Sequence, residues 1–146
     1  MYKIISDIII LGKKPNVLPS NKKFKYWISN VLPVLTHDVH VNVIIVSRSI
    51  IYFLNKKYRN LNTVTNLLVF PFIFKTNTII PIIGDIVICW QIIEYESIKL
   101  NKKLEMHYSH MLIHGLLHLL NYKHNSKKNS VIMMNLEKSI LNNLKY

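Results

Sequence analysis

The segment from His114 to His124 constrains the fold of this chain more than any other. His114 and His118 are four residues apart, so on a helix they project from the same face. The leucines between and after them favour a helix that packs against a core. Asn121 follows where that helix should end, because Asn is among the few residues besides Gly that adopt the left-handed backbone conformation. The segment therefore predicts a core helix over about 105–120.

The same segment predicts a metal site. A reversal of the chain at Asn121 would bring His124 back towards the imidazoles of His114 and His118. Zinc bound by three histidines keeps its fourth position for water, which is typical of catalytic sites. We therefore expect one zinc ion per chain, although three imidazoles also suit nickel or copper. His110 lies four residues before His114, so a shifted pair of these two is an alternative.

Length and charge limit the class of protein. At 146 residues the chain should form a single domain over 1–146. Its 19 basic and 7 acidic side chains give a net charge of +12, which indicates a polyanionic partner or a membrane surface. The single cysteine, Cys89, excludes an internal disulfide and suits a reducing compartment. No secretory signal or membrane-spanning stretch is recognisable, so we expect a cytoplasmic protein without membrane attachment.

Hydrophobic periodicity predicts an α+β domain, with a mixed four-stranded sheet, four to five helices and the histidine helix at the centre. The expected strands are 2–11, 41–47, 67–70 and 86–90, and 72–81 should form a hairpin tip or edge loop. The expected helices are 21–35, 50–58 capped by Ser49, 91–100, 105–120 and 126–144. In the last helix we expect Val131, Met134, Leu136 and Ile140 or Leu141 to point inward.

The remaining polar residues leave little chemistry other than that of a metal. Acids are too scarce for a paired-carboxylate mechanism, and neither a G-x-S-x-G motif nor a glycine-rich phosphate loop is present. Arg59, one of two arginines, is expected at a helix end, as a cation favoured by the helix dipole or as a bidentate phosphate ligand. Asp85 follows a glycine, where it could cap a turn or orient a histidine ligand through its other ring nitrogen.

At these residues the sequence resembles the YbeY family of single-strand-specific endoribonucleases. The family's motif H-G-x-L-H-L-x-G-Y-D-H appears here as HGLLHLLNYKH. Its Asn-x-x-Tyr-Arg segment and T-D-V-L-S-F-P appear as NKKYR, ending at Arg59, and as TNLLVFP over 65–71. The family's G-D-I strand is GDI at 84–86, and its M-x-x-x-E-x-x-I-L pattern is Met133, Glu137, Ile140 and Leu141.

The resemblance implies a metal-dependent endoribonuclease that acts on single-stranded RNA. It implies rRNA processing at the 3′ end of small-subunit rRNA, ribosome quality control, and the small ribosomal subunit as a partner. It also implies His114, His118 and His124 as zinc ligands and Arg59 as the catalytic phosphate-binding residue, with no small-molecule cofactor. Whether water or the RNA 2′-hydroxyl attacks the phosphate stays open.

Four positions depart from the family pattern. Asn121 replaces a Gly, at a cost on the order of 1 kcal/mol for the left-handed conformation. Lys123 replaces an Asp beside the third predicted ligand, and a carboxylate there could have oriented His124. Asn66 and Val69 replace an Asp and a Ser near the expected cleft. Metal affinity and activity are the properties that these changes could reduce.

Two other functions fit the histidines. Their spacing is that of metzincin-like metalloproteases, but Gly115 stands where that chemistry requires a glutamate base. Gly115 could instead leave room for a substrate backbone to approach the metal. The second alternative is a non-catalytic ribosome-assembly factor that binds RNA and contains a structural zinc ion.

Overall fold

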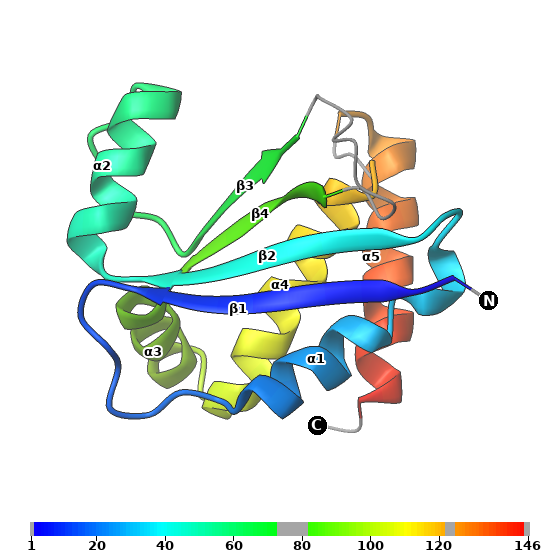
Figure 1. The fold of residues 1–146 in the computed structure, drawn as a ribbon, viewed down its shortest axis with the longest axis horizontal. Coiled ribbons are helices and arrows are strands. Elements are labelled where there is room, and N and C mark those ends of the chain that lie inside the picture. Colours follow the sequence, from blue (N-terminus) through cyan, green and yellow to red (C-terminus); the bar gives the residue numbers. More distant parts are fainter. Residues whose placement is uncertain (1, 73–81, 122–124, 145–146) are drawn as a thin grey trace.

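The computed structural model of the chain describes residues 2–72, 82–121 and 125–144. Its sheet has four strands in the order β1-β2-β4-β3 (Figure 1). Strands β1, β2 and β4 are parallel, and β3 is antiparallel to β4. The strands are β1 Ile4–Leu11, β2 Val39–Val46, β3 Leu67–Pro71 and β4 Ile82–Cys89.

Five α-helices lie in the described part of the chain, so the predicted α+β class with a mixed four-stranded sheet is confirmed. The helices are α1 Asn21–Ser29, α2 Arg48–Arg59, α3 Trp90–Lys99, α4 Leu104–Leu119 and α5 Lys127–Asn143. A short 3-10 helix follows α1 at Leu32–Val34.

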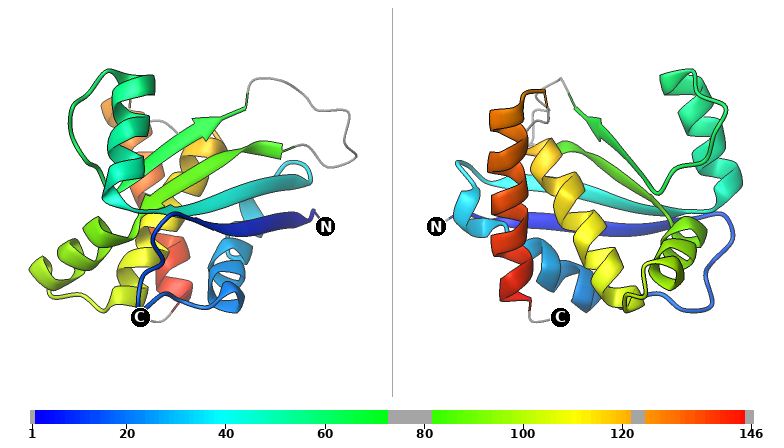
Figure 2. Two further views of the ribbon diagram at one scale, coloured as in Figure 1. Left: turned by 60° about the vertical axis from the view of Figure 1, so that its left-hand side comes forward. Right: turned by 180° about the vertical axis from the view of Figure 1, so that it is seen from behind.

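The two faces of the sheet are covered unequally. The central strands β2 and β4 are rich in Val and Ile and are largely buried on both faces, as expected for central strands of a parallel array. One face packs against α1, α4 and α5 in the main core, whereas α2 covers part of the other face (Figure 2). Beneath α2, Ile51 packs with Val46 and Leu68 in a smaller core. One face of the sheet therefore belongs to the main core, which includes the histidine helix α4, and the other face belongs to the smaller core under α2.

Helix α4 occupies the centre of the main core, as predicted. It contacts α1, α3, α5, β3 and β4, and its side chains Tyr108, Leu112 and Leu116 are fully buried. After α4, Asn121 has a φ of 72°, which confirms the predicted left-handed residue at the helix end.

Some predicted details of the helices are wrong. Helix α1 ends at Ser29 rather than near residue 35, because Pro33 lacks the amide hydrogen that an α-helix needs and lies in the 3-10 turn. The residue that precedes α2 is Ser47 rather than Ser49. In α5, Val131 and Met134 are 46% and 50% exposed. Ile140 is buried as predicted, and Leu136 is partly buried against the main core. Met133 and Leu144, which follows the helix, are also buried.

The predicted hairpin tip at 72–81 lies outside the described residues except for Phe72. In the described part of the chain, no helix combines the length and the apolar character needed to cross a membrane.

Candidate active site

A pocket of about 610 Å³ lies between β3 and the C-terminal half of α4. The residues that line it are distant from one another in the sequence. They belong to α2, to β3 and the residue before it, and to α4 and the turn that follows it. The structure thus brings together Arg59, His114, His118 and Asn121, which the sequence marked separately. The remaining lining residues are Asn66, Leu67, Val69, Pro71 and Met111.

The imidazoles of His114 and His118 form a pair inside this pocket. Their ring centroids are 4.7 Å apart, and their Nε2 atoms are 3.2 Å apart. Two nitrogens that bind one tetrahedral zinc ion at 2.0–2.1 Å must lie about 3.3 Å from each other. The observed separation therefore fits a shared metal ion, with both Nε2 atoms as ligands.

Glu137 of α5 contacts one member of this pair, His114. Its Oε2 lies 2.9 Å from Nδ1 of His114, and its Oε1 contacts Nε2 of His110. Burial alone would raise the pKa of Glu137, but the hydrogen bonds and charges of His110 and His114 outweigh burial and lower the pKa to about 2. An ionised carboxylate only accepts hydrogen bonds, so His114 carries its proton on Nδ1 and directs the lone pair of Nε2 towards His118.

The pocket lining separates the two possible histidine pairs. Glu137 contacts both His110 and His114, but His114 and His118 are the two histidines given in the described lining of the pocket. The geometry favours the original pair over the shifted one. The predicted third ligand, His124, lies outside the described residues. Within the described ranges, no group of three His, Cys, Asp or Glu side chains is placed to bind a metal ion.

Arg59 is the last residue of α2. Asn60 follows with a φ of 56° and ends the helix, so the predicted helix-end position is confirmed. A cation there is favoured by the helix dipole. The same side chain lines the pocket that contains the imidazole pair.

Asp85 and Gly115 have surroundings different from those expected. Asp85 lies on the sheet face away from α4, and its Oδ1 accepts a hydrogen bond from Asn42 at 3.0 Å. Its predicted contact with a histidine ligand therefore finds no support in the described contacts. Gly115 is buried against β4, where an added Cβ would be 3.1 Å from Cγ2 of Ile86. The missing side chain lets α4 approach the sheet, so Gly115 does not make room for a substrate.

Two carboxylates that sequence reasoning left unassigned thus support the pocket. One is Glu137. The other is Glu96 of α3, whose Oε1 accepts hydrogen bonds from Nδ2 of Asn66 and from the buried His107, both at 3.0 Å. The hydrogen bond to Glu96 therefore holds the Asn66 side chain in place in the pocket wall.

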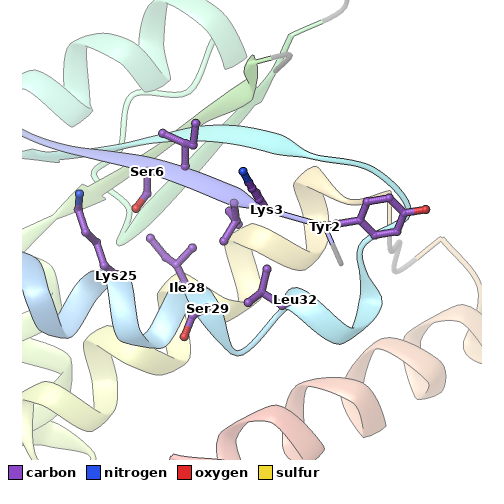
Figure 3. A pocket seen from close by; sticks show the side chains of 9 residues that line it. Tyr2, Lys3, Ser6, Lys25, Ile28, Ser29 and Leu32 are labelled. Carbon is purple, nitrogen blue, oxygen red and sulfur yellow. The ribbon is translucent and has the colours of Figure 1, made fainter. Parts of the chain in front are cut away.

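A second hollow, of about 490 Å³, lies between β1 and α1 (Figure 3). Ile28 and Leu32 supply apolar surface, and Lys3 and Lys25 supply positive charge. As described, its lining residues include no His, Cys, Asp or Glu.

The fold and the site together define a class: a small α+β domain in which a histidine helix, packed on a mixed sheet, shares one pocket with an arginine. A solved structure of this fold is the solution structure of a Thermotoga maritima protein, which matches with a TM-score of 0.65 and 30% identity. The match covers 94% of this chain and 87% of that one.

The family follows from the sequence comparisons. Residues 12–145 match the family described as Endoribonuclease YbeY, and the chain belongs to this family. Similar relatives named Endoribonuclease YbeY come from Buchnera aphidicola, at 40% identity over 100% of this chain and 94% of the relative, and from Blochmanniella pennsylvanica, at 36% over 99% and 92%. A third relative of that name, from Wigglesworthia glossinidia brevipalpis, is 40% identical over 77% of this chain and 74% of its own length.

Proposed function

We propose that this protein is a metal-dependent endoribonuclease that cleaves single-stranded RNA during rRNA processing. The observation that carries the proposal is the shared pocket of Arg59, His114 and His118 in a chain whose relatives are named endoribonucleases. Arg59 can bind a phosphate and the two imidazoles can bind a cation, and metal-assisted cleavage of a phosphodiester uses both at one place.

We propose zinc as the metal, one ion per chain, with His114, His118 and His124 as ligands. When bound, such an ion polarises the scissile phosphate and makes a water molecule a stronger nucleophile near neutral pH. Glu137 keeps the proton of His114 on Nδ1, so that Nε2 is available to a cation. Arg59 binds the phosphate and stabilises the charge that develops in the transition state.

The substrate is held largely by charge in this proposal. A net charge of +12 suits a partner with many phosphates, and affinity should fall steeply as salt rises. We propose rRNA as that substrate, the small ribosomal subunit as the partner and the cytoplasm as the location, as the sequence resemblance implied.

The two alternative functions are less well supported. A metzincin-like protease needs a glutamate base after the first histidine, and Gly115 at this position is buried against Ile86. A non-catalytic assembly factor with structural zinc does not require an arginine beside the imidazole pair.

The test is cleavage of a labelled single-stranded RNA by the purified full chain with zinc supplied. Arg59→Ala and His118→Ala should each reduce the rate at least about 100-fold, the usual cost of removing a transition-state contact. Arg48→Ala is the matched control, because Arg48 is the other arginine and begins the same helix α2, at the end opposite to Arg59. The control should cleave like the parent.

One outcome contradicts the proposed nuclease activity, and a second contradicts only the attack by water. RNA binding without cleavage in the presence of zinc would favour the assembly factor. A 2′,3′-cyclic phosphate on the product would show that the RNA hydroxyl, rather than water, attacks the phosphate.

A further inference from the structure

Helix α2 exposes aromatic side chains on the surface next to the pocket. Phe53 and Tyr58 are 59% and 60% exposed, and Tyr52 is also exposed. Exposed apolar side chains that gather in one patch, unlike single ones, can mark a binding surface. The exposed side chains Lys56 and Lys57 accompany them, and the helix sequence, RSIIYFLNKKYR, contains no acid.

The ammonium group of Lys57 lies between two of these rings. Its Nζ is 5.7 Å from the centroid of Phe53 and 5.3 Å from that of Tyr58. The three side chains therefore form one aromatic–basic surface, which we call the α2 platform: Phe53, Lys57 and Tyr58.

The α2 platform is attached to the wall of the pocket. The Tyr58 ring packs edge-on against Phe70 of β3, with centroids 5.3 Å apart and planes at 66°. Val69 and Pro71, the neighbours of Phe70 along β3, line the pocket on the opposite face of the strand. Since β3 is an edge strand and Arg59 follows Tyr58, the platform and the pocket meet across this edge.

We propose that the α2 platform stacks the bases of a single-stranded RNA whose scissile phosphate lies in the pocket. This inference rests on the proposed function and adds the place where flanking nucleotides bind. Aromatic side chains stack on any base because every base has a π face, and a neighbouring cation binds the adjacent phosphate. The bases of a duplex are already stacked on one another, so such a surface selects single strands.

Charge makes RNA the favoured occupant over a protein. A protein-binding surface is usually depleted of lysine at its centre. Here the ammonium group of Lys57 lies over both rings of the platform, at 5.7 and 5.3 Å from their centroids.

The experiment measures equilibrium binding of a fluorescent single-stranded RNA to the full chain. A His118→Ala background prevents cleavage during the measurement. Phe53→Leu and Tyr58→Leu keep apolar bulk but remove the ring, and each should weaken binding about 5- to 150-fold. Tyr58→Phe keeps the ring and should bind within about twofold of the parent.

The matched control is Tyr95→Leu. Tyr95 is 56% exposed and has Lys99 above its ring at 5.8 Å, but it lies on α3, away from the platform. This variant should bind RNA like the parent. An oligomer of equal length that lacks bases separates stacking from charge, since ring removal should leave its affinity unchanged.

Three outcomes overturn the inference: parental RNA affinity in the two leucine variants, equal losses for the RNA and the baseless oligomer, or an equal loss in Tyr95→Leu. If Tyr58→Leu unfolds because Phe70 loses its ring contact, the RNA affinity of Phe53→Leu alone tests the inference. Failure of the proposed function is distinguishable, because the parent chain would then cleave no RNA. If the parent cleaves and the leucine variants bind normally, only the platform is refuted.

Discussion

The substitution Glu137→Gln tests a residue of the site for which the sequence analysis predicted no role. Glutamine has the shape of glutamate but no charge, and its NH₂ group cannot accept a hydrogen bond. One of the two imidazole contacts of Glu137 is therefore lost, and the other becomes a neutral hydrogen bond. His114 is then less well oriented, and the basicity of its Nε2 falls.

The expected effect is a weaker zinc affinity by about 10- to 100-fold, the usual result of losing an outer carboxylate. This corresponds to about 1.4–2.8 kcal/mol. The size agrees with the hydrogen bonds, because a bond to a charged group contributes about 1 kcal/mol more than a neutral one. A chromophoric chelator that competes for zinc measures the dissociation constant directly.

The matched control is Glu105→Gln, since Glu105 is an acid at the start of α4 that pairs with Lys23, away from the pocket. Its zinc affinity should equal that of the parent. Parental affinity in Glu137→Gln, with the fold intact by circular dichroism, would refute the reasoning that this carboxylate orients the ligand. An equal loss in both variants would point to a general charge effect instead.

Three further predictions concern stability and reactivity. Gly84→Ala should lower the free energy of unfolding by about 1–3 kcal/mol in a urea titration, because the new Cβ would lie 2.5 Å from the carbonyl oxygen of Phe70; a neutral result would contradict the tight packing. Asn66→Asp restores the family residue but places a second carboxylate against Glu96, so it should cost about 1–3 kcal/mol at neutral pH. A variant as stable as the parent would exclude this repulsion. Burial raises the pKa of the Cys89 thiol, so thiol reagents should modify the native protein at least about 10 times more slowly than the unfolded chain; equal rates would show that the thiol is accessible.

Much of the fold was predictable because its signals are local. The spacing of Phe24, Trp27 and Ile28 predicted α1, and all three are buried. The position of Asn121 after the last leucines predicted the end of α4, because few residues adopt a positive φ. Patterns within one turn of helix or one strand were sufficient in these cases.

The inward face of α5 was only partly predicted, since Ile140 is buried but Val131 and Met134 are exposed, and the reason is physical. Apolar residues occur on several sides of this helix, so their spacing alone did not determine which side packs against α4. The observed stripe is Met133, Glu137, Ile140 and Leu144, at steps of four, three and four. The family pattern had already marked Met133 and Glu137 four residues apart, but it gave Glu137 no role.

The composition of the pocket could not be predicted from local patterns, because it depends on tertiary contacts. Helical spacing predicted the pair His114 and His118, but no local pattern shows that Arg59 lines the same pocket or that Glu96 supports Asn66. The family resemblance implied roles for some of these residues without showing their contacts. Whether His124 completes the ligand set stays a prediction.

The contact between α4 and α5 through Glu137 has a consequence for chains that lose sequence at their ends. A truncated relative could keep every predicted ligand and the arginine, yet lose the carboxylate that orients the first imidazole. A comparison that counts only the predicted metal ligands would then classify an impaired relative as an intact nuclease. To judge whether a shortened homologue is still active, its C-terminal helix must therefore be compared as well as its histidines.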